Sequence, residues 1–231
     1  MAVAANNTGM GDTMASSANT APAAVHGWLD RANHFFELPL SGRSRLLVIA
    51  SVLLLIPSFF YPLYIMTLYS NQFPDGLVLK IYSYTLEGGQ TPNRDDLREI
   101  NTLNHYIGMR PLLESDFSEF KWLPFGIGAI ALLALRAVVI GKMSKLVDLV
   151  VMSLYFSLFS LWSFAHRLYQ YGHVLDPSAP VKVKPFTPPV FGMQQIANFT
   201  VFNYPGFGTY LITGSLLAMI VALLLSARQK S

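Results

Sequence analysis

The sequence predicts an all-α integral membrane protein, with four transmembrane helices and an ordered extracytoplasmic cap formed by two long loops. The first observation is composition: of 231 residues, 52% are hydrophobic and 13% are charged, and the mean hydropathy is +0.41. Soluble domains carry roughly 25% charged residues, about twice as many. The second observation is that the apolar residues gather in four runs. Each run supplies about 20 predominantly apolar residues, which cross a hydrocarbon core of ~30 Å at ~1.5 Å per residue.

The N-terminal region divides into two parts. Residues 1–25 are small and polar and lack the basic start and apolar stretch of a secretory signal peptide, so they predict a disordered tail that is retained. Residues 26–41 differ, because Trp28, Phe35 and Phe36 fall on one side of a helix, opposite charged residues. This pattern is typical of a short amphipathic helix lying in the membrane interface, and a plain linker is the alternative.

The transmembrane domain is expected from residue 42 to residue 231. Its expected spans are residues 45–69, 122–140, 146–171 and 207–227, and its outer loops are residues 70–121 and 172–206. Pro57 and Pro62 should kink the first span, because each removes a backbone donor and crowds the preceding turn. Both loops are longer than ~12–15 residues and rich in aromatic residues, so we expect them to form ordered structure.

The basic residues predict the orientation of the chain. They gather beside the expected inner ends of the spans: Arg43, Arg45, Arg136, Lys142, Lys145, Arg228 and Lys230. The positive-inside rule therefore places both termini, and the link between the second and third spans, in the cytoplasm. The first loop has five basic and eight acidic residues, a net charge of −3, which agrees with a location outside. Lys182 and Lys184 in the second loop oppose this orientation.

The first loop predicts a strand followed by a helix. Residues 77–86 are rich in β-branched and aromatic residues, and the turn Pro74-Asp75-Gly76 precedes them. The helix is expected to start with Thr91 or Asn93 as its cap and to end at Gly108 and Pro111. Its apolar stripe consists of Leu97, Ile100, Leu103 and Ile107.

A histidine and a methionine four residues apart form the candidate metal site. His105 and Met109 are expected opposite the apolar stripe, and four residues rise only ~6 Å along a helix. An imidazole and a thioether favour copper, Cu(I) above all. His173 and Met193 in the second loop are the second choices as ligands. The alternative is a hydrogen-bonded histidine beside an ordinary methionine, because two ligands do not make a site.

Several functional classes are excluded or disfavoured. The chain has no cysteine, which excludes disulfides, iron–sulfur clusters and thiolate zinc sites. It has no Gly-rich phosphate loop, no GxSxG nucleophile motif and no HExxH zinc motif, so we expect a non-enzymatic protein. Its net charge of +3 is small and dispersed, which disfavours a nucleic-acid partner.

Three long segments resemble a known family: FPDGLVLKIYSYTLEGG, NTLNHYIGMRPL and YGHVLDPSAPVKVKPFTPPVFGMQQIANFTVFNYPGFGTYL. Over about residues 45–227 the chain is similar to small four-helix bacterial membrane proteins of the NosB type. This family is associated with gene clusters that mature the copper enzyme nitrous oxide reductase. The resemblance implies a multi-pass protein of the bacterial inner membrane, and it carries over no catalytic residues.

Two functions follow from these observations. The first is a non-enzymatic membrane accessory protein that helps copper handling or the assembly of a periplasmic copper enzyme. The alternative is a structural subunit of a larger membrane-bound respiratory or oxygenase complex, since the Phe-rich helices suit packing against partners. A transporter or channel is the least favoured interpretation, because the spans hold few polar residues. The expected partners are the lipid bilayer and other membrane or periplasmic subunits.

Overall fold

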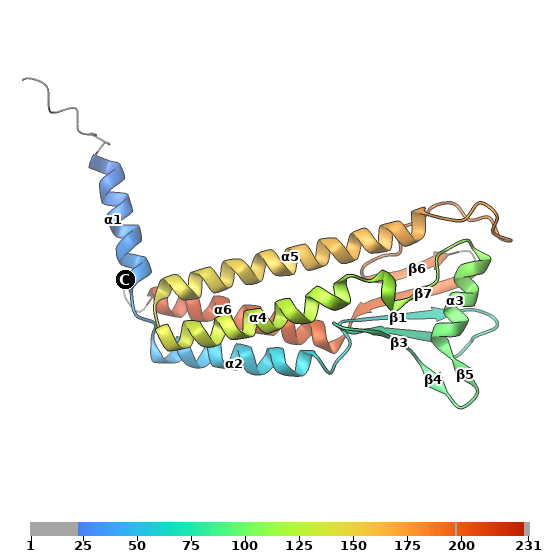
Figure 1. The fold of residues 1–231 in the computed structure, drawn as a ribbon, viewed down its shortest axis with the longest axis horizontal. Helices are drawn as coiled ribbons and strands as arrows, with labels where there is room; N and C mark the ends of the chain where they lie inside the picture. Colours follow the sequence, from blue (N-terminus) through green and yellow to red (C-terminus); the bar gives the residue numbers. More distant parts are fainter. Residues whose placement is uncertain (1–22, 197, 229–231) are drawn as a thin grey trace, which may run out of the picture.

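The computed structural model describes residues 23–196 and 198–228, which form a helical bundle and a cap at one end of it (Figure 1). The bundle consists of α2 (Gly42–Ser58), α4 (Glu119–Ile140), α5 (Met143–His173) and α6 (Phe207–Arg228), and α1 (Ala23–Glu37) leads into it. The cap comprises α3 (Asp96–Tyr106), a 3₁₀ turn (Glu114–Asp116) and two sheets. Its strands are β1 (Tyr64–Tyr69), β2 (Leu77–Ile81), β3 (Leu86–Gly88), β4 (Gln90–Thr91), β5 (Arg94–Asp95), β6 (Gly192–Ile196) and β7 (Phe199–Pro205).

The predicted all-α fold is wrong, because the cap contains a five-stranded antiparallel sheet with the strand order β3-β2-β1-β7-β6. The predicted first span, residues 45–69, divides into a helix and a strand: α2 ends at Ser58, and Tyr64–Tyr69 form the central strand β1. Pro57 and Pro62 stand at the break, where neither can donate a backbone hydrogen bond. The segment after them is β-branched and aromatic, which favours a strand.

The four-span topology is also wrong. Of the helices in the described part of the chain, three are long and apolar enough to cross a membrane: Glu119–Ile140, Met143–His173 and Phe207–Arg228. These helices are what a membrane protein requires, and they support that broad class. α2 has 17 residues, which at ~1.5 Å per residue reach ~25 Å.

Small side chains let α2 and α6 pack closely. Ser44, Ser51 and Ser58 recur every seven residues on α2 and are fully buried. Ser226 on α6 donates its hydroxyl hydrogen to the Ser44 hydroxyl at 2.7 Å, and Ser44 donates to the Ala222 carbonyl at 2.8 Å. Seven-residue spacing keeps one seam facing the neighbouring helix, and small residues allow the backbones to approach.

The two long loops fold together into the cap. β1 pairs with β7 along its whole length, from Tyr64 opposite Pro205 to Tyr69 opposite Thr200. The inner face of the sheet packs on α3 and on the end of α5, around a core that includes Leu77, Leu79, Ile100, Phe117 and Tyr171. The predicted apolar stripe of α3 therefore faces this core.

α3 forms where the sequence predicts a helix, but its N-terminal cap differs from the predicted one. Asp95 caps the helix, because its Oδ1 accepts hydrogen bonds from the amides of Leu97 and Arg98. Neither Thr91 nor Asn93 takes this role, since residues 90–95 form the small β4–β5 hairpin. The expected strand over residues 77–86 is interrupted by a turn between β2 and β3.

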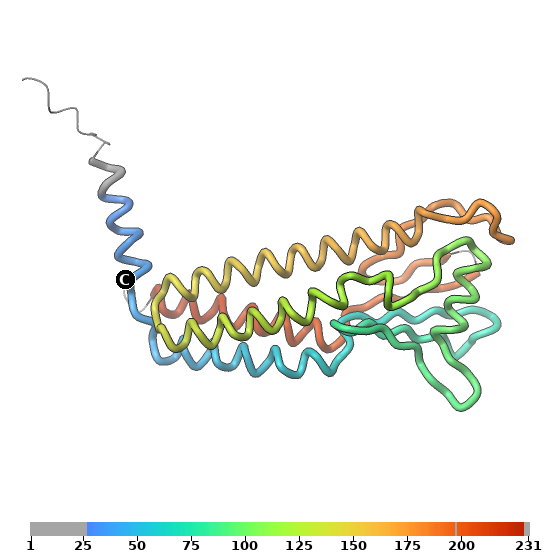
Figure 2. Tube along the Cα trace, viewed as in Figure 1, coloured from blue at the N-terminus to red at the C-terminus, as the bar shows by residue number. Residues whose placement is uncertain are grey.

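The other end of the bundle carries α1, the α4–α5 link and the end of α6 (Figure 2). The amide of Leu40 donates to the Gly141 carbonyl at 2.7 Å, and the amide of Met143 donates to the Leu38 carbonyl at 2.8 Å. These bonds fix the exit of α1 against the link. The predicted tail, residues 1–25, lies outside the described residues except for its last three, which open α1.

Candidate functional site

A pocket opens where α3 and α5 end. It has a volume of about 510 Å³ and is lined by residues that follow the two helices, including His105, Met109, Arg110, Asp176 and Ser178. The chain turns sharply at Gly108, whose φ is +80°, a conformation that favours glycine. The Gly108 carbonyl accepts a hydrogen bond from the Asp176 amide at 2.8 Å, which joins the two loops at the floor of the pocket.

The pocket brings together the two first-choice metal ligands. His105 is exposed on the last turn of α3, and Met109 is half-buried just after the helix, partly packed on the cap core. Asp176 lies on the other wall, where its Oδ1 accepts hydrogen bonds from the Ser178 amide at 2.8 Å and the Ser178 hydroxyl at 2.6 Å. These two bonds lower the pKa of Asp176 below its usual value.

The second-choice ligands lie elsewhere. His173 ends α5, its Nδ1 is 3.0 Å from the Tyr169 carbonyl oxygen, and its ring stacks on Tyr169 with centroids 3.8 Å apart. Met193 is 65% exposed on β6, opposite Phe202 of β7. Within residues 23–196 and 198–228, no group of three or more histidine, cysteine, aspartate and glutamate side chains is close enough to share a metal ion.

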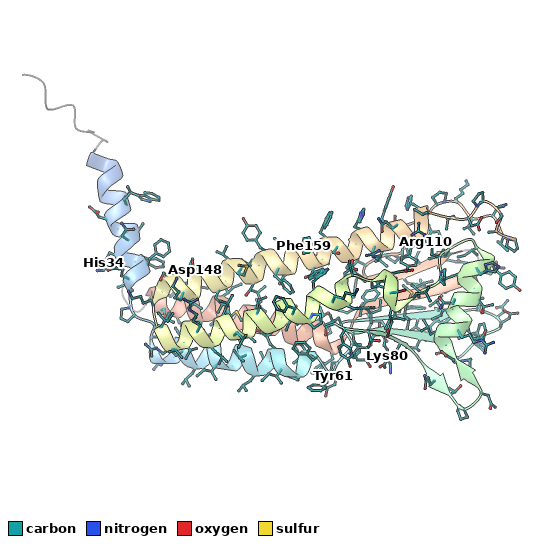
Figure 3. The ribbon with its side chains drawn as sticks, in the orientation of Figure 1. His34, Tyr61, Lys80, Arg110, Asp148 and Phe159 are labelled. Carbon is teal, nitrogen blue, oxygen red and sulfur yellow. The ribbon has the colours of Figure 1, made fainter. Side chains whose placement is uncertain are left out.

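The donor set of the pocket fits a soft metal only in part. One imidazole and one thioether suit copper, and the Asp176 carboxylate adds an oxygen donor on the opposite wall. Arg110 lines the same pocket, beside the outer end of α5 (Figure 3), and its positive charge opposes a bound cation. Sequence reasoning did not assign Asp176 or Arg110 to this site, because Asp176 comes from the other loop and arginine is not a metal ligand.

A second feature is an uncovered apolar surface on the sheet. Alternate residues of β7 point to opposite faces: Val201 and Asn203 are buried toward α5, and Phe202 and Tyr204 are exposed. We call the exposed group the aromatic sheet face; it consists of Tyr69, Phe191, Met193, Phe202 and Tyr204, which are 38–72% exposed. Tyr69 and Phe202 already meet edge to face at 5.6 Å.

The aromatic sheet face continues into the top of the bundle. β7 runs through Gly206 directly into α6, where Phe207 and Tyr210 are exposed. The Phe207 ring packs edge to face on Tyr61 at 4.9 Å, just after the end of α2. Exposed Tyr rings at the end of a long apolar helix are typical of proteins that cross a membrane. The sheet face begins where α6 begins and extends away from that helix.

Comparison with known proteins gives no relatives: no family model, curated protein or solved structure matches the chain. The resemblance to the NosB-type family accordingly stays a prediction, and the functional argument rests on this chain's own geometry.

Proposed function

We propose that the protein is a non-enzymatic accessory subunit of the bacterial inner membrane, with its termini in the cytoplasm and its cap in the periplasm. In this proposal the cap docks a second membrane-anchored protein on the aromatic sheet face. This is the structural-subunit function among the sequence-based hypotheses, and the exposed rings of the sheet are the observation that favours it.

The aromatic sheet face is continuous with the exposed end of α6, and this continuity indicates the chemistry of the partner. The aromatic sheet face lies outside α4, α5 and α6, where lipid tails do not cover it, yet it joins the exposed rings of Phe207 and Tyr210 at the top of α6. A partner that covers both surfaces needs an apolar face that crosses the membrane boundary. β6 adds an open sheet edge beside the exposed Met193, which an extended partner segment can pair with.

Substitution in the centre of the face tests this docking. When the full chain is purified from its native membrane in mild detergent, a reproducible partner chain is expected to copurify with it. A photoreactive residue placed at Phe202 should crosslink to that partner. Phe202→Asp should remove that partner, because it buries a charge at the contact. Tyr84→Asp is the matched control, since Tyr84 is 49% exposed in the turn between β2 and β3. Retention of the same partner by Phe202→Asp, or no crosslink from position 202, overturns the proposal.

Copper handling for a periplasmic copper enzyme is the second candidate function. It is favoured by the presence of His105 and Met109 in one open pocket. The purified protein is expected to contain close to one Cu(I) per chain. His105→Ala should lose this copper, and Met109→Ala should bind it more weakly. His166→Ala should keep its copper, because His166 lies on α5 outside the pocket. Copper that is equally retained by His105→Ala, or absent from the unsubstituted protein, overturns this function.

A further inference from the structure

α5 carries an exposed row of mostly aromatic side chains spaced alternately three and four residues apart. We call it the α5 row; it consists of Met152, Tyr155, Phe159, Trp162, His166, Tyr169 and His173. The first four and Tyr169 are 50–71% exposed, His166 is exposed and His173 is partly exposed. The mean spacing of 3.5 residues is that of a helix seam that follows a partner helix along its length.

Several rings of the row are already ordered against one another. Trp162 and His166 stack with their planes 7° apart and their centroids at 5.5 Å, and Tyr169 and His173 stack at 3.8 Å. Phe159 and Trp162 lie 5.9 Å apart. Side chains that are held in place before binding lose less conformational entropy when a partner arrives.

Lipid tails suit the aliphatic flank of α5 better than the row, because Tyr155 and Trp162 of the row each carry a polar group that finds no partner among lipid tails. The flank of Leu154, Leu158 and Leu161 is exposed and aliphatic, and further along the same side Leu168 is buried by the cap. The row instead stays open to the end of the helix. α5 has 31 residues and is ~46 Å long, so a hydrocarbon core of ~30 Å that starts near Lys145 ends before His166.

We propose that the α5 row is the contact between two copies of this chain, packed as parallel helices about a two-fold axis along the membrane normal. The membrane gives both copies the same direction, so their α5 helices run parallel. In a parallel pair with a 3.5-residue seam, each position meets its own counterpart. A row that meets itself needs side chains that do not repel one another. The row has no carboxylate, lysine or arginine, and Asp148, one turn before it, is paired with Lys145 at 3.1 Å.

The position of α5 leaves room for a second copy. The helix forms one long edge of the molecule, and Phe159 lies on that edge (Figure 3). The aromatic sheet face belongs to β1, β6 and β7 and is a separate surface, so self-association through α5 does not depend on the proposed docking partner.

The absence of cysteine makes a direct crosslinking test possible. Trp162→Cys and Leu161→Cys place single thiols at neighbouring positions of similar exposure, 61% and 55%, on the row and on the aliphatic flank. In native membranes, a short bismaleimide should join two copies of Trp162→Cys roughly tenfold more efficiently than two copies of Leu161→Cys, because paired thiols have a high effective concentration. Phe159→Cys should likewise exceed Leu158→Cys.

Two controls keep the result interpretable. Labelling of each thiol by a monofunctional maleimide shows that the variant is folded in the membrane and accessible. The unsubstituted protein in mild detergent should have a protein mass about twice the 25.6 kDa of one chain by light scattering. Equal crosslinking at positions 161 and 162, no homodimer from any labelled row position, or crosslinks only to a different chain would each overturn the proposal.

Discussion

In the bundle, the buried polar atoms are mostly serine hydroxyls that bond to nearby backbone, whereas the cap buries a carboxylate paired with an arginine. Ser51 and Ser58 donate to carbonyls of their own helix at 2.7 and 2.6 Å. Asp96 in the cap is 2% exposed; its Oδ1 is 2.7 Å from Arg94 Nε, and its Oδ2 accepts from the Val78 amide at 2.8 Å. A hydroxyl is satisfied by one local bond, while a buried charge needs several partners.

Buried polar groups have different structural roles in the two regions. Between α2 and α6, serine is small enough for close packing, and its hydroxyl finds an acceptor either on its own helix, as at Ser51 and Ser58, or across the contact, as at Ser44. In the cap, Asp96 joins α3 to β2 through the Val78 amide and to the β4–β5 hairpin through Arg94, and each strand of that hairpin is only two residues long. The bundle should therefore be sensitive to side-chain volume, and the cap to the loss of one charge.

The largest expected effect is loss of the cap carboxylate. Asp96→Asn removes the charge that Arg94 and the Val78 amide share, and should lower the stability of the cap by about 3 kcal/mol. Limited proteolysis of the detergent-solubilised protein, with cleavage sites mapped, measures the effect. Asp148→Asn is the matched control, because Asp148 is 67% exposed in its ion pair with Lys145 and should change stability by less than ~1 kcal/mol. Equal proteolysis of the two variants would show that the Asp96 pair does not hold the cap.

A smaller effect is expected from volume added to the bundle seam. Ser44→Ile places a branched side chain where Ser44 is fully buried against Ala222 and Ser226, and should cost about 2 kcal/mol through overpacking. The loss of helical circular dichroism on heating measures it. Leu46→Ile, at a 67% exposed position two residues away, should leave the melting temperature nearly unchanged. If Ser44→Ile has the same melting temperature as the unsubstituted protein, the close contact of α2 and α6 is not required for stability.

The same contrast explains which parts of the fold the sequence predicts. α4, α5 and α6 are long apolar runs, and α3 has a clear apolar stripe, so local patterns suffice for them. β1 continues the apolar run of α2 because its inner face is buried, and hydropathy alone does not separate a buried strand from a helix. Its partner β7 lies about 130 residues further along the chain, and no local pattern shows that pairing.

The candidate pocket likewise contains residues that local sequence patterns predict and residues that they do not. His105 and Met109 are predicted together because they are four residues apart on one short segment. Asp176 reaches them because backbone bonds join the two loops, from the Asp176 amide to Gly108 and from the Val181 amide to Tyr106. His173 is instead turned onto Tyr169 by a stacking contact. Spacing along the chain therefore identifies the half of the pocket that is local, and misses the half that the folding of the two loops supplies.

The smallest expected effect concerns the wall of the pocket. Asp176 is fully exposed, and its pKa is lowered mainly by the hydrogen bonds from Ser178. These bonds therefore stabilise the turn fully at a pH above ~3.9, which is the usual pKa of aspartate. That stabilisation is lost as the pH falls through the lowered pKa. Ser178→Ala removes the hydroxyl donor and should raise the pKa of Asp176 toward its usual value. A carboxyl-carbon NMR titration of selectively labelled protein measures the shift. Ser115→Ala is the control, because the Ser115 hydroxyl bonds to Asp116 at 3.5 Å and its removal should leave the titration of Asp176 unchanged. An unchanged titration of Asp176 in Ser178→Ala would show that the hydroxyl does not shape this wall.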